Sequence, residues 1–217
     1  MQSKNLKALN TIIYIDGFNL YYSLKKTPYK WLNLKKLIEN ILDPSLHKIL
    51  NIKYFTAIPK RADSAQRQSV YIRALKTLQN IEIIYGQFKK RQVKGKEVKT
   101  NKVITVNKWE EKKSDVNIAS YIIYDSCKKN IDCVVLLSND TDLTTPLEIV
   151  KYKLKKRIVI ITPTKRVENL GDPILPRKSH IELRKLSKVS LSIKEQDLKE
   201  SQFPNTINRI SKPKSWL

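Results

Sequence analysis

The chain has 217 residues, and its 43 lysine and arginine residues outnumber its 20 acidic residues, which gives a formal charge of +23. This length favours one compact domain that buries about 70% of the surface of the unfolded chain. Because hydrophobic residues make up 41% of the sequence, a disordered basic tail is excluded. The positive surplus favours a polyanionic partner, either nucleic acid or an anionic membrane surface.

The sequence also argues against a membrane protein and against a zinc protein. No apolar run reaches the roughly 18 residues that a bilayer span requires, and the first residues lack the apolar stretch of a secretion signal. We therefore expect a soluble, cytoplasmic protein without a membrane partner. The two cysteines, Cys127 and Cys133, have no histidine at ligand spacing, which disfavours structural zinc.

The first part of the chain alternates β-rich runs with helical patterns. Strands end at glycine twice, at Gly17 and Gly86, and the stripe LKKLIENIL has the apolar spacing of an amphipathic helix. In chain order the pattern predicts a strand at 11–16, helices at 17–26 and 34–42, a strand at 52–58, a helix at 64–78 and a strand at 81–86.

The composition changes in the next segment. Residues 87–113 are rich in lysine and hold two stretches in which polar and apolar residues alternate, separated by Gly95. This favours a basic β-hairpin. After it, the pattern predicts a helix at 115–129, a strand at 132–138, a helix at 146–155 and a strand at 157–162. Residues 163–217 contain five prolines and one predicted helix, at 181–186.

Alternation of apolar strands with helices predicts a three-layer α/β/α sandwich around a mainly parallel sheet. We expect residues 1–162 to form the domain, with the hairpin inserted at about 87–109. Residues 163–217 would form an extension that packs on this domain or wraps it. In parallel sheets, ligands bind beyond the carboxyl ends of the strands.

Acidic residues stand at two of these strand ends. Asp16 ends the run TIIYID, and Asp140 follows VVLLSN. The carboxyl ends of adjacent strands can lie within a few ångström, and partly desolvated carboxylates there favour a cation. Taken singly, each aspartate is more often a turn or cap residue, so the prediction depends on their joint placement.

Two further aspartates have alternative roles. Asp142 either lies free in the loop, if Thr145 begins a capping box with Pro146, or is itself a helix N-cap. Asp115 follows Ser114, a reasonable N-cap, and either complements the helix dipole or faces Asp16 and Asp140 as another ligand. Carboxylates without nearby histidine or cysteine suit Mg²⁺ or Mn²⁺, which can support phosphodiester hydrolysis.

The segments DGFN (16–19), EEKKSDVNIA (110–119) and LLSNDTDL (136–143) resemble the signature segments of the NYN domain family, a branch of the PIN-like nucleases. SQFP (201–204) and KPKSW (212–216) resemble the end of one bacterial subfamily, so the likeness covers nearly the whole chain. Two departures are mild: Leu143 stands where many relatives have Phe, and the insertion is unusually rich in lysine.

The resemblance implies a PIN-like fold and a divalent-metal-dependent ribonuclease. It also implies an acidic cluster of Asp16, Asp115, Asp140 and Asp142, with Asn19 orienting Asp16 or the substrate. From the residues alone, Asn19 could equally cap the following helix.

Basic residues around the hairpin are candidates for binding the RNA backbone, although lysines on edge strands also prevent aggregation. Tyr21, Tyr22 and Trp109 could stack on bases, although for Tyr21 a place in the core is favoured. The predicted nucleic-acid-binding residues are Lys89, Lys90, Arg91, Lys94, Lys96, Lys99, Lys102, Lys112, Lys113 and Tyr22.

The leading hypothesis is an endoribonuclease that uses Mg²⁺ or Mn²⁺ on single-stranded or loop RNA. The alternatives are a non-catalytic RNA-binding module and, more weakly, a DNA nuclease. A haloacid-dehalogenase-type phosphatase fails because Phe18 stands where that chemistry needs a second aspartate. The oligomeric state stays open, with a homo-oligomer among the alternatives.

Overall fold

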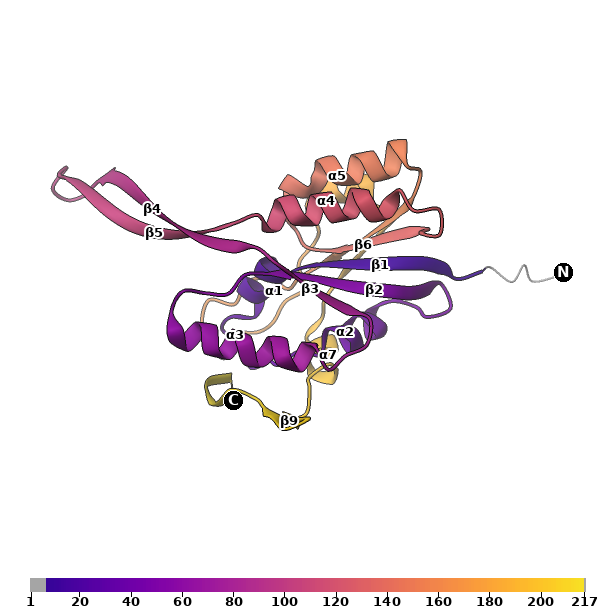
Figure 1. Ribbon diagram of the computed structural model, residues 1–217, viewed down its shortest axis with the longest axis horizontal. Helices are drawn as coiled ribbons and strands as arrows, with labels where there is room; N and C mark the ends of the chain where they lie inside the picture. Colours follow the sequence, from indigo (N-terminus) through magenta and orange to yellow (C-terminus); the bar gives the residue numbers. More distant parts are fainter. Residues whose placement is uncertain (1–6, 217) are drawn as a thin grey trace.

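A six-stranded sheet forms the centre of the computed structural model, which describes residues 7–216 (Figure 1). Its strands are β1 (Leu9–Asp16), β2 (His47–Thr56), β3 (Ile81–Tyr85), β6 (Cys133–Leu137), β7 (Arg157–Thr162) and β8 (Val189–Ser192). Every neighbouring pair is parallel, in the order β3-β2-β1-β6-β7-β8. The order reverses between β1 and β6, and such a switch point is where parallel sheets bind ligands.

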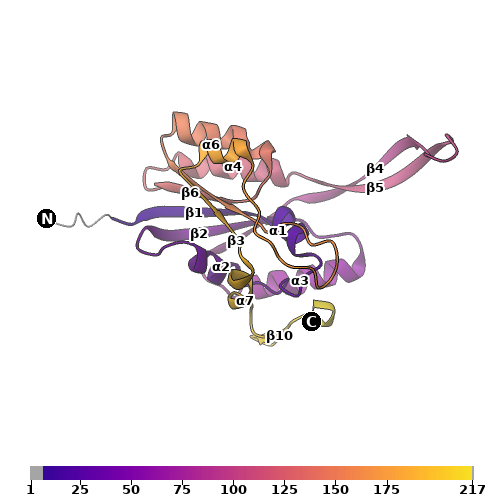
Figure 2. The same cartoon turned by 180° about the vertical axis from the view of Figure 1, so that it is seen from behind.

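Helices cover both faces of this sheet (Figures 1 and 2). One face carries α1 (Gly17–Leu24), α2 (Leu34–Ile41), α3 (Ala62–Leu75) and α7 (Glu195–Glu200). The other carries α4 (Ser114–Ser126), α5 (Thr144–Glu148) with its π-helical continuation (Ile149–Lys153), and α6 (Ile181–Leu186). The expected α/β/α sandwich is thus confirmed.

Successive side chains of β1 pack into two different apolar clusters, one on each face of the sheet. Ile13 and Ile15 pack into the cluster on the α1, α2 and α3 side, whereas Ile12 and Tyr14 pack into the cluster under α4 and α5. Successive strand residues point to opposite faces, so a strand buried on both sides must be apolar throughout. This requirement explains the continuous apolar run TIIYI.

The predicted helix starts need correction. Ser114 is not the N-cap of α4, because Lys113 holds that position with a left-handed φ of 78° and Ser114 already belongs to the helix. Thr145 does not begin a capping box either, since α5 starts at Thr144 as the continuation of a 3₁₀ turn at Thr141–Leu143.

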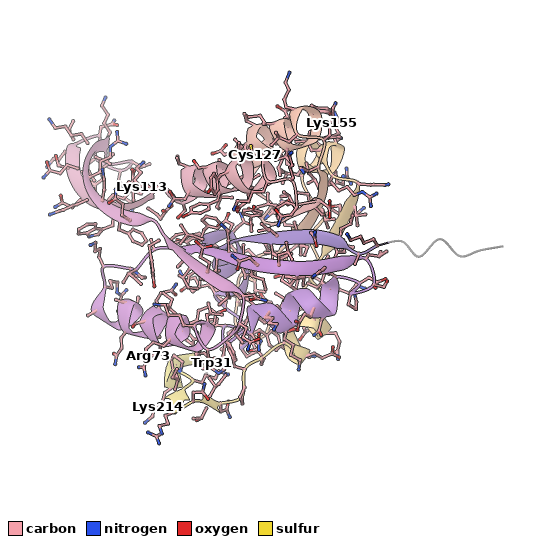
Figure 3. All side chains as sticks on the ribbon, turned by 45° about the vertical axis from the view of Figure 1, so that its right-hand side comes forward. Trp31, Arg73, Lys113, Cys127, Lys155 and Lys214 are labelled. Atoms are coloured by element: carbon pink, nitrogen blue, oxygen red, sulfur yellow. The ribbon has the colours of Figure 1, made fainter. Side chains whose placement is uncertain are left out.

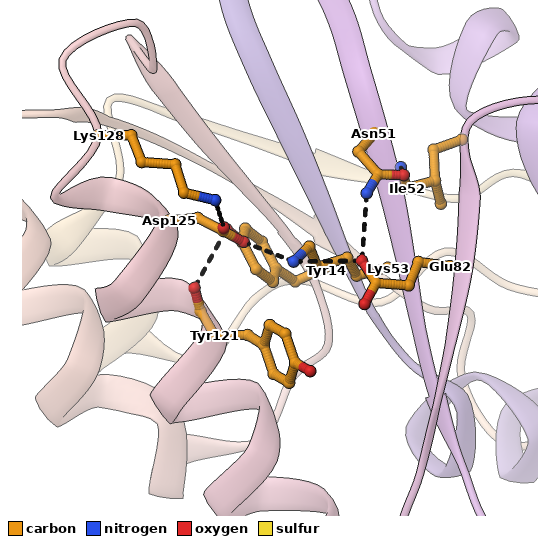
Figure 4. Close-up of polar contacts among 8 residues, drawn as sticks. All are labelled: Tyr14, Asn51, Ile52, Lys53, Glu82, Tyr121, Asp125 and Lys128. Atoms are coloured by element: carbon orange, nitrogen blue, oxygen red, sulfur yellow. Dashed lines mark hydrogen bonds and ion pairs between the residues drawn. The ribbon is translucent and has the colours of Figure 1, made fainter.

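A buried polar network joins the far end of α4 to the sheet (Figure 4). The Asp125 carboxylate accepts a hydrogen bond from the Tyr14 hydroxyl at 2.9 Å and lies 2.9 Å from Lys53 Nζ and 2.6 Å from Lys128 Nζ. Burial alone would raise the pKa of Asp125, but the hydrogen bonds from Lys128, Lys53 and Tyr14 outweigh it and lower the pKa. The network fixes α4 against β1 and β2.

The basic hairpin is confirmed as β4 (Gln87–Lys96) and β5 (Val103–Lys112), which pair with each other and project from the body (Figure 1). It leaves the sheet at Gly86, where an added Cβ would lie 2.5 Å from Glu111 Oε1 and 2.7 Å from Ser114 Oγ. A glycine here lets the two ends of the hairpin cross closely at the start of α4.

Residues 163–217 contribute more structure than the single predicted helix. Besides α6, which lies at the expected residues, they supply β8, α7, the short pair β9 (Thr206–Ile207) and β10 (Ile210–Ser211), and a 3₁₀ turn at Lys214–Trp216. Phe203, Ile210 and Trp216 join the apolar cluster of α1, α2 and α3. Among residues 7–216, none of the helices combines the length and apolar character needed to cross a membrane.

Candidate metal centre

Three carboxylates from separate parts of the chain meet at the switch point of the sheet. Asp16 is the last residue of β1, Asp140 follows β6, and Asp115 lies in the first turn of α4. One carboxylate oxygen from each lies within 4.8 Å of the others. Because β1 and β6 are neighbouring parallel strands, their carboxyl ends deliver Asp16 and Asp140 to the same edge.

Asp16 is the most buried and the most firmly held of the three. Its Oδ1 accepts hydrogen bonds from the backbone N–H groups of Phe18 and Asn19, at 3.0 and 2.9 Å, and its Oδ2 accepts one from Ser138 Oγ at 2.9 Å. Asp16 is therefore also the N-cap of α1. Burial, against the hydrogen bonds and with smaller contributions from Asp115 and Asp140, raises its pKa to about 6.

Gly17 allows this tight turn from β1 into α1. A Cβ on Gly17 would lie 2.4 Å from the backbone oxygen of Phe55 and 2.9 Å from the Tyr54 ring, both on β2. Any side chain would push α1 away from the sheet, and with it the two N–H groups that hold Asp16. The placement of the Asp16 carboxylate therefore depends on a glycine at position 17.

Asp115 is more exposed than Asp16, but it too lies close to other carboxylates. Partial burial, followed by the nearby charges of Asp140, Glu111 and Asp142, raises the pKa of Asp115. Glu111 is held close because its Oε1 accepts hydrogen bonds from the backbone N–H and the hydroxyl of Ser114. Glu111 is an acidic neighbour that the sequence patterns did not single out.

Asp140 lies in the acidic group, as expected, and is also a capping residue. At the start of the 3₁₀ turn its Oδ1 accepts a hydrogen bond from the Asp142 N–H at 3.0 Å. The interpretation of Asp142 as an N-cap is therefore wrong, and Asp142 lies within the 3₁₀ turn rather than free in a loop. Asp142 is exposed and lies outside the group of three, although its charge acts on Asp115.

Asn19 does not cap α1, since Asp16 does so. Its side-chain oxygen accepts a hydrogen bond from the Asn139 N–H at 3.2 Å, and the Asn139 side chain in turn accepts one from the His180 N–H at 2.8 Å. Asn19 thus ties α1 to the loop that carries Asp140, whereas the expectation was that it orients Asp16 or the substrate.

A cavity of about 760 Å³ opens over the carboxylates. Of the predicted nucleic-acid-binding residues, Arg91, Lys112 and Tyr22 line it. Lys113 lies where the hairpin meets α4 and is not among the lining residues (Figure 3). The others are exposed along the hairpin, outside this cavity: Lys89, Lys90, Lys94, Lys96, Lys99 and Lys102.

The sequence analysis missed part of this lining. Arg166 and Arg177 come from the loop after β7, and Phe88 and Lys108 from the hairpin. The loop after β7 could have been predicted as part of the site, because ligands bind beyond the carboxyl ends of parallel strands and β7 is one of these strands. Glu110 offsets some of the positive charge, since it pairs with Arg91, Lys108 and Lys112 at 3.2–3.8 Å.

Comparisons with known proteins place the chain in a family. The chain is 32% identical to the 6-hydroxy-3-succinoylpyridine 3-monooxygenase of Pseudomonas putida, in a match that covers 100% of this chain and 78% of that protein. A crystal structure of a protein of unknown function from Vibrio parahaemolyticus has the same fold, with a TM-score of 0.55, 15% identity, and coverage of 94% of this chain and 100% of that one.

The family comparison agrees with the architecture. The family model of the NYN domain matches residues 10–172, which is most of the chain. The six-stranded parallel sheet between helical layers is consistent with the PIN-like superfamily, whose fold is nuclease-like. This protein is therefore a member of the NYN domain family.

Proposed function

We propose that this protein is a divalent-metal-dependent endoribonuclease that hydrolyses phosphodiester bonds in RNA. The observation that carries the proposal is the convergence of Asp16, Asp115 and Asp140, within 4.8 Å of one another, beneath a cavity lined by basic side chains. Carboxylates repel a polyanion unless a cation lies between them. An acidic centre bordered by arginine and lysine side chains therefore fits a phosphodiester held against a metal ion.

The donor set fits Mg²⁺ or Mn²⁺. All three candidate ligands are carboxylate oxygens, which these hard ions prefer. Burial first, and then the neighbouring carboxylates, raise the pKa values of Asp16 and Asp115, and a bound cation would offset both effects. When bound, such an ion lowers the pKa of water and stabilises charge on phosphate oxygens.

Different residues of the chain would hold the metal ion, position its ligands and bind the substrate. Asp16 is fixed by three donors and would be the rigid ligand, while Asp115 and Asp140 complete the set. Asn19 holds the Asp140 loop against α1. Arg91, Arg166 and Arg177 would bind phosphates of the substrate on either side of the scissile bond, because their guanidinium groups match phosphate geometry.

The experiment compares cleavage of a labelled single-stranded RNA by the full chain with Mg²⁺, with Mn²⁺ and with EDTA. We expect cleavage only with metal, and a loss of more than about 100-fold in Asp16→Asn and Asp140→Asn. Asp132→Asn is the matched control, because Asp132 precedes β6 at the opposite edge of the sheet and its contact with the Asn10 N–H can be made by asparagine.

The outcomes separate the alternatives. Metal-independent cleavage, or equal cleavage by Asp16→Asn, would refute the proposal. Tight, salt-sensitive RNA binding without cleavage would identify a non-catalytic RNA-binding module. A DNA strand of the same sequence in parallel reactions tests for a DNA nuclease, and preference for DNA would contradict the ribonuclease assignment.

A further inference from the structure

A second cavity, of about 220 Å³, lies beside the cavity over the carboxylates. The two cavities share three wall residues, Phe18, Tyr22 and Phe88. Phe18 comes from α1 and Phe88 from the hairpin, and their rings meet edge to face with centroids 5.9 Å apart. The second cavity is therefore adjacent to the cavity over the carboxylates, and these two rings line both cavities.

Aromatic side chains form a large part of its wall. Tyr21 and Tyr22 are 40% and 49% exposed, and their rings meet at 5.6 Å between centroids. The expectation that Tyr21 belongs to the core is thus wrong. Tyr54 and Trp216 complete the wall, and both are buried. Trp216 is held there by contacts with Trp31 and Tyr71.

Polar groups are placed at one side of this aromatic cavity. Gln68 donates a hydrogen bond from Nε2 to Thr56 Oγ1 at 2.8 Å, and both line the cavity. Arg67, also in the lining, is oriented by Asp63 Oδ2 at 3.2 Å and by Ser64 Oγ at 3.1 Å. An aromatic cavity with a few fixed polar groups is suited to a flat ring that carries hydrogen-bonding atoms on its edge.

We propose that the second cavity binds one nucleobase of the RNA strand, next to the phosphate at the metal centre. This inference rests on the proposed function. The rings of Tyr21 and Tyr22 offer stacking surfaces, and Arg67 and Gln68 lie where the edge of a base would meet polar groups. A base inside a duplex cannot enter such a cavity, so the site selects single-stranded or unpaired nucleotides.

Two of these residues serve as specific probes, because Tyr21 and Arg67 line the second cavity and not the first. Each has a matched control. Arg73 lies on the same helix, α3, on its outer side (Figure 3), and Tyr152 is an exposed tyrosine on the α5 side of the sheet. All four side chains reach solvent, so their replacement by alanine should leave the fold intact.

The experiment measures binding of the four ribonucleoside 5′-monophosphates and of ribose 5-phosphate to the full chain by calorimetry, with Mg²⁺ present. We expect at least one nucleotide to bind more tightly than ribose 5-phosphate. Tyr21→Ala and Arg67→Ala should each weaken binding of that nucleotide by about 5- to 150-fold. Binding of ribose 5-phosphate should stay within twofold, as should all binding by Tyr152→Ala and Arg73→Ala.

Equal binding of nucleotides and ribose 5-phosphate by the parent protein would overturn the proposal, as would equal weakening of both by the two variants. A hydroxypyridine without phosphate is a third probe, chosen because one relative is named for a pyridine substrate. If it binds as tightly as the best nucleotide, and Tyr21→Ala weakens it equally, the cavity belongs to a free small ring and the proposal is overturned.

The RNA cleavage assay separates this proposal from the proposed function. If nucleotides bind as expected but RNA is not cleaved with any metal, the base site stands and the ribonuclease assignment fails. If RNA is cleaved but Tyr21→Ala and Arg67→Ala match the parent in both kcat and KM, the ribonuclease assignment stands and the base site fails.

Discussion

At the scale of single residues, two effects on the Asp16 carboxylate oppose each other when no metal is bound. Its hydrogen bonds to Phe18, Asn19 and Ser138 require a fixed acceptor, while its burial disfavours the ionised form. Its pKa of about 6, against an ordinary value of 3.8, corresponds to about 3 kcal/mol of lost stability at neutral pH. This cost is present above pH 6 and disappears as the pH falls toward 4.

We therefore expect Asp16→Asn to stabilise the metal-free protein by about 1 to 3 kcal/mol at pH 7.5, because asparagine keeps an acceptor for the two backbone N–H groups. The advantage should shrink as the pH falls from 6 to 4, since the parent carboxyl group then protonates. Urea unfolding in EDTA at several pH values measures both effects.

The control for this prediction is Asp132→Asn, which should change stability by less than about 0.5 kcal/mol. Adding Mg²⁺ should reverse the order, since a ligand that binds the native parent protein more tightly stabilises it by mass action. A parent protein more stable than Asp16→Asn in EDTA at pH 7.5 would contradict the assigned electrostatic cost.

At the scale of elements, the hairpin and α4 both contribute residues to the site. The hairpin is a two-stranded ribbon whose outer part carries lysines and makes no pairing with the central sheet. Such a ribbon contributes little to the packed interior, so its charge can be changed without unfolding the domain. The ends of α4, in contrast, fix Asp115 at one end and the Asp125 network at the other.

For the hairpin, we expect the triple variant Lys94→Gln, Lys96→Gln and Lys99→Gln to weaken RNA binding and to make the dependence of log K on log salt shallower by about 2. The three lysines are exposed, so the thermal midpoint should not change. The control triple is Lys129→Gln, Lys153→Gln and Lys155→Gln, three exposed lysines in the turn after α4 and at the end of the π-helical continuation of α5. Equal losses in both triples would indicate a general effect of net charge.

For α4, we expect Lys53→Met to destabilise the protein by about 3 kcal/mol, because it removes one partner from the buried Asp125 carboxylate. Lys35→Met is the matched control, since the Lys35–Glu39 pair is exposed and 3.9 Å long, and should cost less than about 1 kcal/mol. Urea midpoints compare the two, and similar losses would show that the Asp125 network does not anchor α4.

At the scale of the whole molecule, the last part of the chain closes the interior rather than hanging from it. Trp216 lies in the apolar cluster of α1, α2 and α3, and its ring meets Trp31 and Tyr71 at 6.3 and 5.7 Å between centroids. The same residue forms a wall of the second cavity. The packing of the core and the shape of that cavity therefore both depend on Trp216.

We expect Trp216→Ala to lower stability by about 3 kcal/mol, within the range measured for buried aromatic residues. It should also weaken nucleotide binding, because the cavity loses a wall. Lys214→Ala is the control from the same 3₁₀ turn, with an exposed side chain (Figure 3). Unfolding curves that are unchanged in Trp216→Ala would show that the end of the chain is dispensable for the core.

The sequence by itself determined the elements and their class. The short runs TIIYI and CVVLL lack the polar alternation of a half-exposed strand, which is typical of strands buried on both faces, and their alternation with helical patterns predicts the layered parallel fold. The positions of Asp16 and Asp140 after such strands predicted their meeting, because carboxyl ends of parallel strands share an edge. The short polar strand β8, VSLS, carries no such signal and was missed.

Only the tertiary structure decided which side chains share a space. Whether Asp142 belongs to the acidic cluster depended on where a 3₁₀ turn begins, and that is fixed by one hydrogen bond to Asp140. The second cavity joins residues as distant in sequence as Tyr21, Arg67 and Trp216. Local patterns report local geometry, whereas such a cavity exists only through the packing of separate elements, which no pattern along the chain encodes.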